Sequence, residues 1–139
     1  MEVRWIDLYS KSDDRGSLVI AEAQKNIPFN INRVYCLYNL NEEPRGFHAH
    51  KELQQVVVCL AGSCKFLLDN GREKVIVDLS IKSAGLFVDK MIWHEMYDFS
   101  SDCVLMVLAS EHYDEGDYIR KYNEFKDIGS AKVSNIASS

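Results

Sequence analysis

The sequence predicts one all-β domain, a sandwich or jelly-roll barrel, with a single helix near its C-terminus. Three observations carry this prediction. The chain has 139 residues, which fits one compact domain. From about Ile31 to Ser110, apolar residues alternate with polar ones or form runs of five or six, broken by turn residues, as in short β-strands. A helical period occurs once, after these strands end.

Four runs rich in Val, Ile, Leu and Phe are strand candidates, joined by short loops at Gly62 and around Lys90. They are Arg33–Tyr38, Gln54–Leu60, Gly85–Val88 and Cys103–Ala109. Many short antiparallel strands at this spacing are typical of a sandwich or a jelly-roll barrel.

The clearest unit is a hairpin between Cys64 and Leu79. Apolar side chains alternate on both arms, at Cys64, Phe66 and Leu68 and then at Val75, Val77 and Leu79. Asp69-Asn70-Gly71 supplies the turn, because Asn-Gly tolerates the positive φ angles of a type I′ turn. We therefore expect two adjacent antiparallel strands here.

A segment with helical spacing follows the strands. Tyr118, Ile119, Tyr122 and Phe125 fall on one face of a segment that Asp114 opens and that closes near Gly129. This helix is expected to pack on the outside of the barrel. Residues 130–139 are small and polar and are expected to form a flexible tail, so the predicted domain spans residues 1–129.

Composition limits the class of partner. Apolar residues make up 47% of the chain and charged residues 27%, as in a soluble globular protein. Sixteen Lys and Arg against 21 Asp and Glu give a net charge of −5, which leaves no broad basic face for DNA or RNA. A few locally placed arginines can still hold a small anion.

The four cysteines indicate a reducing compartment. Cys36, Cys59, Cys64 and Cys103 lie in apolar runs, without C-x-x-C spacing and without a preceding signal-like stretch. We interpret them as buried free thiols in a cytoplasmic protein. No apolar run approaches the ~18 to 20 residues that span a bilayer, so no membrane partner is expected.

The most unusual stretch contains His48 and His50. On an extended strand, residues two apart point to the same face, so both imidazoles are expected to line one cavity if that face is the barrel interior. The plainer interpretation is a pair of surface histidines. The preceding Arg-Gly bend and the following buried strand favour the cavity.

An H-x-H pair also begins the cupin metal motif, in which a Glu four or five residues later and a further His complete the site. Here Gln54 and Gln55 stand at the expected place, and Glu52 follows His50 too closely. A neutral amide is a poor substitute for a carboxylate. His48, His50 and His94 still leave three nitrogen ligands open as an alternative.

The other interpretation makes the histidines acid–base catalysts, because an unperturbed pKa of about 6.5 allows proton transfer near neutral pH. Arg15, Arg33 and Arg45 lie in or beside strand-like segments, and guanidinium groups pair well with phosphate oxygens. Each arginine alone could be a solvated edge residue. Tyr35 shares strand parity with Arg33, so both are expected to face the same side.

Trp93 and His94 follow a β-run and a short loop. An aromatic residue beside a histidine can form one wall of a ligand site, although a core Trp beside a rim His is equally common. Arg120, on the predicted helix, is interpreted as a surface residue.

Several separated motifs resemble those of the sugar-nucleotide 3,4-ketoisomerases of the cupin superfamily. In chain order they are D-R-G-S-L at 14–18, N-R-V-Y at 32–35, P-R-G-F-H-A-H at 44–50, W-H-E-M at 93–96, Y-D-E at 113–115 and D-Y-I-R at 117–120. The resemblance spans residues 4 to 126 and implies a cupin fold, a double-stranded β-helix or jelly-roll barrel.

The resemblance implies an enzyme that converts dTDP-4-keto-6-deoxy-D-glucose to its 3-keto isomer for the synthesis of 3-amino-3,6-dideoxy sugars. It implies no metal and no organic cofactor, and a homodimer in which the N-terminal strand joins the partner's sheet. Carried over to this sequence, the catalytic residues are His48, His50 and Tyr35. The expected substrate-binding residues are Arg15, Arg33, Arg45, Trp93 and His94.

The R-G-S and W-H-E-M forms are similar to the branch that yields the galacto product. Asp89-Lys90-Met91 departs from the Gly-Pro that relatives tend to have before Trp-His, which affects the shape of that loop. Three alternatives stay open: a metal-dependent cupin enzyme, a dTDP-sugar 3,5-epimerase and a non-catalytic sugar-nucleotide-binding module.

Overall fold

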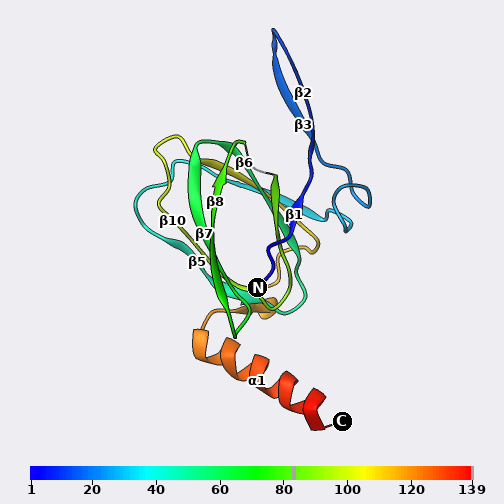
Figure 1. Cartoon of the computed structure of the whole chain (residues 1–139), viewed down its shortest axis with the longest axis vertical. Coiled ribbons are helices and arrows are strands. Elements are labelled where there is room, and N and C mark those ends of the chain that lie inside the picture. The colour runs from blue at the N-terminus through cyan, green and yellow to red at the C-terminus, as the bar shows by residue number, and fades with distance from the viewer. Residues whose placement is uncertain (83, 139) are drawn as a thin grey trace.

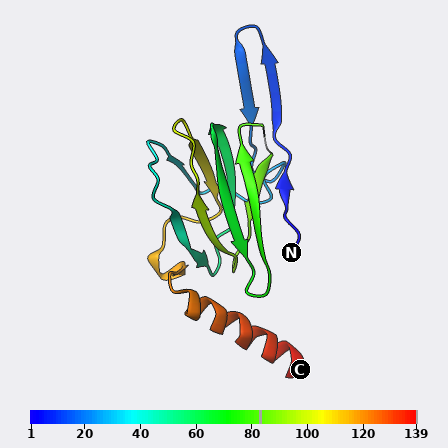
Figure 2. The same ribbon diagram turned by 60° about the vertical axis from the view of Figure 1, so that its left-hand side comes forward.

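Two five-stranded antiparallel sheets face each other as a jelly-roll barrel, with a hairpin projecting at one end and a helix at the other (Figure 1; Figure 2). This computed structural model describes residues 1–82 and 84–138, and the side chains of these residues up to Ser130. The prediction of an all-β cupin barrel with one C-terminal helix is confirmed.

The first sheet has the strand order β1-β9-β6-β11-β4, and all its pairs are antiparallel. Its strands are β1 (Trp5–Ile6), β4 (Arg33–Leu37), β6 (Gln55–Ala61), β9 (Gly85–Val88) and β11 (Val104–Ala109). Strand β9 is buried throughout and β6 is buried from Gln55 to Cys59, because the inter-sheet core covers one face of these strands and a cluster that includes Ile27 and Phe29 covers the other.

The second sheet has the order β12-β5-β10-β7-β8. Its strands are β5 (Arg45–His50), β7 (Ser63–Asp69), β8 (Lys74–Ser80), β10 (Trp93–Tyr97) and β12 (Tyr118–Ile119). The core lies between the two sheets, where alternate side chains meet. Its most deeply buried members include Val57, Phe66, Leu79, Leu86 and Leu105.

The predicted strands match the observed ones closely, and Gly85–Val88 is confirmed at both ends. The predicted hairpin is confirmed as β7 and β8, but the predicted type I′ turn is wrong. Asp69 pairs with Lys74, so the loop has four residues, of which Gly71 has a positive φ of 93°. Asn70 instead accepts hydrogen bonds from the backbone N–H groups of Arg72 and Glu73, which closes the wider loop.

The helix begins later than predicted. Helix α1 spans Tyr122–Ser138, whereas Glu115–Asp117 form a 3₁₀ turn (η1) and Tyr118–Ile119 form β12. Pairing of β12 with β5 overrides the helical spacing, because Tyr118 pairs with His50 in the sheet. The predicted end near Gly129 is also wrong, since one helical glycine costs only about 1 kcal/mol.

The N-terminal hairpin was not among the predicted strands. It consists of β2 (Tyr9–Asp13) and β3 (Gly16–Ile20), which pair only with each other and project from the barrel (Figure 1). Every residue of β2 is exposed, so its sequence has no apolar alternation to reveal a strand. Leu18 and Val19 of β3 are also about half exposed, at 51% and 48%.

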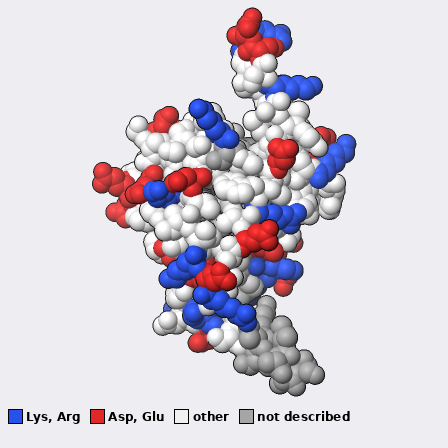
Figure 3. Space-filling view, viewed as in Figure 1, with Lys and Arg blue, Asp and Glu red and all other residues white. Residues whose placement is uncertain are grey.

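On the face shown in Figure 3, basic and acidic side chains are interspersed rather than gathered by sign. Cys59, Cys64 and Cys103 are buried free thiols as predicted, but Cys36 is exposed, because its side chain points outward from the edge strand β4. Among the described residues, no helix is both long and apolar enough to cross a bilayer.

Candidate active site

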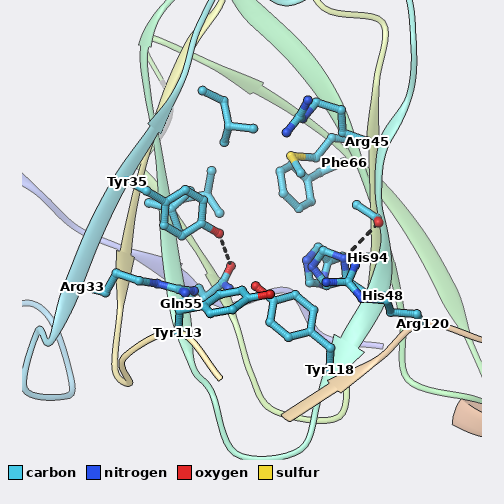
Figure 4. Close-up of a pocket in the computed structure, with 15 residues that line it drawn as sticks. Arg33, Tyr35, Arg45, His48, Gln55, Phe66, His94, Tyr113, Tyr118 and Arg120 are labelled. Atoms are coloured by element: carbon cyan, nitrogen blue, oxygen red, sulfur yellow. Dashed lines mark hydrogen bonds between the residues drawn. The ribbon is translucent and has the colours of Figure 1, made fainter. Parts of the chain in front are cut away.

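A cavity of about 350 Å³ opens between the two sheets (Figure 4). Phe66, Val57 and other apolar side chains form part of its wall. The polar part of the wall consists of Arg33, Tyr35, Arg45, His48, Gln55, His94, Tyr113, Tyr118 and Arg120. An apolar cleft with a few convergent polar groups is the usual form of a small-molecule site.

A β-bulge in β5 positions His48. His94 pairs with His48 while Glu95 pairs with Gly46, so Phe47 is the extra residue. Gly46 has a φ of +94°, and a Cβ on it would lie 2.8 Å from the carbonyl oxygen of His94. Only glycine therefore allows this close approach of β5 to β10. His48 Nδ1 donates to the Gly46 carbonyl at 2.9 Å, which leaves Nε2 as the basic nitrogen.

Three histidines form one cluster beside the cavity. The ring centroid of His48 lies 4.9 Å from that of His50 and 4.6 Å from that of His94. His48 and His94 line the cavity. His50 is 3% exposed and lies outside the cavity lining, so the structure brings the predicted pair together but gives only His48 direct access to the cavity.

Burial keeps these imidazoles neutral. Loss of solvent is the main cause that lowers the pKa of His48 below its usual 6.5 and that of His94 to about 3. The pKa of His50 falls to about 2, again mainly through burial and then through the neighbouring His94 and His48. At neutral pH the cluster therefore consists of proton acceptors.

Tyr35 of β4 is connected to the histidine cluster through Gln55 of β6. The Tyr35 hydroxyl donates to Gln55 Oε1 at 3.4 Å (Figure 4). The amide nitrogen of Gln55 lies 3.4 Å from His50 Nε2. Burial raises the pKa of Tyr35 to about 12, so its phenol keeps its proton and can donate it in a hydrogen bond.

Arginines give the cavity a positive potential. The Arg33 guanidinium lies 5.0 Å from the Tyr35 ring centroid, and its buried Nε has no hydrogen-bond partner. Arg120 forms a two-pronged ion pair with Glu115 and lies 4.3 Å from the Tyr118 ring centroid. An unpartnered guanidinium nitrogen beside a cavity is suited to a phosphate or another anion.

Two of the predicted substrate-binding residues, Arg15 and Trp93, do not line the cavity. Arg15 is at the exposed tip of the β2–β3 hairpin, paired with Asp13. Trp93 is buried on the other side of β10, where its ring meets Tyr122 and Phe125 and its Nε1 donates to Glu95. The position of Trp93 does not support the predicted substrate contact, because adjacent residues of β10, such as Trp93 and His94, face opposite sides of the sheet.

Sequence reasoning did not assign four polar residues of the lining to the site: Gln55, Tyr113, Tyr118 and Arg120. Arg120 was interpreted as a surface residue, and Tyr118 was placed on a helix. Both belong to a segment that crosses the cavity mouth after β11, and β12 ties that segment to β5. The signal for Gln55 was available, because it occupies the position of the metal-binding Glu in the cupin motif.

The cupin fold raises the question of a metal ion. The nitrogen atoms of His48, His50 and His94 lie within 4.8 Å of one another, a spacing compatible with three ligands. However, the amide nitrogen of Gln55, rather than a carboxylate, faces His50 Nε2. The described residues lining the cavity include arginines and no carboxylate. Three neutral imidazoles can hold zinc by themselves, but the arginines that line the same cavity favour an anionic ligand over a resident divalent cation.

Comparison with known proteins identifies a matching family and a curated relative. The family described as FdtA: WxcM-like, C-terminal matches residues 1–130. A curated relative from Aneurinibacillus thermoaerophilus, named TDP-4-oxo-6-deoxy-alpha-D-glucose-3,4-oxoisomerase, is 56% identical over 127 residues, covering 91% of this chain and 91% of the relative.

Two crystal structures of 3,4-ketoisomerases are also similar to this chain. A 3,4-ketoisomerase from Helicobacter canadensis is 43% identical, covers 94% of this chain and 98% of its own, and superposes with a TM-score of 0.89. A mutant of the 3,4-ketoisomerase QdtA from Thermoanaerobacterium thermosaccharolyticum, in complex with TDP-4-keto-6-deoxyglucose, is 42% identical with a TM-score of 0.89. Its match covers 93% of this chain and 94% of that structure.

Proposed function

Because the chain belongs to the FdtA family (WxcM-like, C-terminal), we infer that it is a sugar-nucleotide 3,4-ketoisomerase. It moves the keto group of TDP-4-keto-6-deoxyglucose from C4 to C3. The observation that carries this function is the neutral His48 imidazole, which lines a cavity together with the protonated Tyr35 phenol and with Arg33, whose buried Nε has no partner. The 3-keto product suits a later amination, as in the synthesis of 3-amino-3,6-dideoxy sugars.

The substrate is proposed to bind with its hexose in the cavity and its diphosphate toward the arginines. Arg33 supports this orientation because its buried Nε has no protein partner. Arg45 and Arg120 also line the cavity and add positive charge. Fixing the diphosphate would hold the sugar still, which supplies a large share of catalysis in many enzymes.

His48 is proposed as the base. The C4 ketone acidifies the C3 hydrogen, and His48 Nε2 removes it as a proton, so the C3–H electron pair forms the C3=C4 double bond of an enediolate. The imidazolium then returns a proton to C4, the O3 hydroxyl loses its proton, and O4 gains one. The result is a C3 ketone and a C4 alcohol, with no net gain or loss of electrons or protons.

Tyr35 is proposed to assist the exchange between the two oxygens. Its hydroxyl lines the cavity and keeps its proton because burial raises its pKa to about 12. A neutral phenol can donate to O4 as negative charge develops there and accept from O3 as the new ketone forms. His50, predicted as a second proton carrier, would then act through Gln55 and Tyr35, since it lies outside the cavity lining.

The galacto product follows if His48 alone handles the carbon-bound proton. In the gluco substrate the C3 hydrogen lies on the lower face of the ring, and in a galacto product the C4 hydrogen lies on that same face. One imidazole that removes and returns the proton on a single face therefore gives the axial C4 hydroxyl. A gluco product would need a donor on the opposite face.

A homodimer with exchange of the N-terminal strand is part of the proposal. The β2–β3 hairpin projects from the barrel and carries half-exposed Leu18 and Val19, which a partner subunit would cover. Arg15 would then reach a ligand only in the partner's cavity. A cytoplasmic location is also proposed, because the described cysteines are all free thiols.

Product analysis tests the function directly. The purified protein is treated with chelator and incubated with TDP-4-keto-6-deoxyglucose, and the product is identified by NMR. We expect a 3-keto isomer with an equatorial C4 hydrogen, seen as a small coupling to the C5 hydrogen. Exchange at C5 without movement of the ketone would indicate an epimerase, and loss of turnover that added metal restores would indicate a metalloenzyme. Recovery of unchanged substrate would contradict the proposal.

A further inference from the structure

Four polar side chains form a line from the edge of the barrel to the cavity. Asp117 of η1 has its Oδ2 atom 3.8 Å from His50 Nδ1. On the other side of this ring, His50 Nε2 lies 3.4 Å from the Gln55 amide nitrogen. The amide oxygen of Gln55 in turn accepts from the Tyr35 hydroxyl, as the dashed line in Figure 4 marks.

This line fixes where the His50 ring carries its hydrogen. Because the Tyr35 phenol is protonated and donates to Gln55 Oε1, the amide nitrogen is the end of Gln55 that faces His50. An amide nitrogen can only donate, so His50 Nε2 must accept. The hydrogen therefore sits on Nδ1, the atom that faces Asp117.

Asp117 is held in place independently of His50. Its Oδ1 accepts from the backbone N–H of Glu52 at 2.8 Å, and its Oδ2 accepts from that of Leu53 at 3.1 Å. These bonds aim the carboxylate at His50 Nδ1, which is buried and has no hydrogen-bond partner. A separation of 3.8 Å is too long for a hydrogen bond but short enough for a strong charge interaction.

The arginines near the cluster oppose a positive charge there, whereas Glu115 favours one on His48. Arg33 and Arg120 both disfavour the charged form of His50, as do the neighbouring imidazoles. During turnover, however, the cluster must hold the proton taken from C3. Among the described ion pairs, that of Asp117 is the one that places a carboxylate within 4 Å of a histidine of the cluster.

Resting on the proposed function, we propose that Asp117 is a positioning residue of the isomerase, which holds His50 in the Nδ1–H tautomer and offsets the positive charge on the histidine cluster. The order Asp117, His50, Gln55, Tyr35 also links this carboxylate to the phenol that serves the substrate oxygens. Loss of the charge should therefore slow the chemical step without weakening substrate binding.

The kinetic test compares Asp117→Asn with Asp114→Asn. Both remove one carboxylate charge from the same segment, but Asp114 caps η1 by accepting from the Gly116 N–H and does not face the histidines. We expect Asp117→Asn to lower kcat by about tenfold or more, part of the 10²- to 10⁴-fold that a positioned acid or base supplies. KM should stay within about twofold, and Asp114→Asn should match the wild type.

A spectroscopic test starts from the wild-type enzyme, so its first result does not depend on whether a variant folds. Long-range ¹H–¹⁵N NMR of the wild-type enzyme should show His50 as the Nδ1–H tautomer, and Asp117→Asn should reduce that population. An Nε2–H tautomer in the wild type overturns the proposal. It is also overturned if Asp117→Asn keeps the kcat of Asp114→Asn, or if its kcat loss comes with an equal rise in KM. Failure of the proposed function is distinct, because the wild type itself would then leave the substrate unchanged.

Discussion

His48 and His94 lie directly opposite each other in the pairing of β5 and β10, with their ring centroids 4.6 Å apart. Each donates its Nδ1–H to a backbone carbonyl two residues earlier in the chain, that of Gly46 or of Ile92. Each ring therefore keeps a basic Nε2. Because positive charge on one imidazole disfavours it on the other, the pair accepts one proton more readily than two.

Replacement of His48 should stop the chemical step. His48→Asn keeps a polar side chain of similar size but removes the basic nitrogen, so we expect kcat to fall about 10²- to 10⁴-fold. TDP affinity should change little, as isothermal titration calorimetry would report. His112→Asn, which alters an exposed histidine outside the cavity lining, is the matched control. Wild-type turnover by the His48 variant would exclude it as the base.

The glycine of the β5 bulge should be intolerant of any side chain. In Gly46→Ala, the new Cβ would meet the His94 carbonyl oxygen at 2.8 Å in a backbone with a φ of +94°. We expect a loss of about 1 to 3 kcal/mol in unfolding free energy, measured in urea, together with reduced kcat.

Gly129→Ala is the control for this prediction. Gly129 lies in helix α1 with no atom near a new Cβ, so alanine should leave stability unchanged or raise it by up to about 1 kcal/mol. Equal behaviour of the two variants would mean that the bulge does not depend on glycine.

The buried histidines should make the fold sensitive to mild acid. His94 and His50 have folded-state pKa values of about 3 and about 2, against about 6.5 when unfolded. Below pH 6.5 the unfolded chain therefore binds protons that the folded chain cannot, and stability falls as the pH falls. The expected loss is about 1 kcal/mol per pH unit for each histidine.

Urea unfolding between about pH 6.5 and 5 isolates this effect, because most carboxylates do not titrate there. A free energy of unfolding that stays constant across this window would show that the histidines are not buried in their neutral form. Above about pH 6.5 the histidine contribution should level off.

Arg33 should contribute to binding rather than to the proton transfer. Arg33→Met removes the unpaired guanidinium but keeps much of the apolar stem beside Tyr35, so we expect KM to rise about tenfold or more, with a smaller change in kcat. Arg72→Met, in the exposed β7–β8 loop, is the control. If both variants have wild-type KM, the diphosphate does not bind at Arg33.

The barrel could be predicted from sequence because its strands alternate toward a shared core. Gly85–Val88 and the Cys64 to Leu79 hairpin carry that pattern in full. The β2–β3 hairpin could not be found in this way, because β2 buries no side chain. Tyr118 was misplaced since helical spacing is a local signal, whereas its pairing with His50 joins residues far apart in the chain.

The site was predictable to the extent that its residues share a strand or a motif. Strand parity placed Arg33 and Tyr35 in one cavity, and the H-x-H motif placed His48 there. Parity also placed His50 on the same side as His48, with their ring centroids 4.9 Å apart, but Tyr118 and Gln55 lie against the His50 ring and it does not line the cavity. Trp93 was expected beside the ligand through its sequence neighbour His94, but adjacent strand residues face opposite sides.

Gln55 separates two kinds of chemistry that this barrel can support. It occupies the position at which metal-binding cupins carry a glutamate, and its amide contacts both His50 and Tyr35. Exchange of its amide nitrogen for oxygen would place a second carboxylate near the histidine cluster, in addition to Asp117, and would give the Tyr35 hydroxyl a charged partner. A glutamate at this position would thus add a carboxylate to the three imidazoles as a potential metal ligand, at the cost of the neutral amide that now contacts Tyr35 and His50.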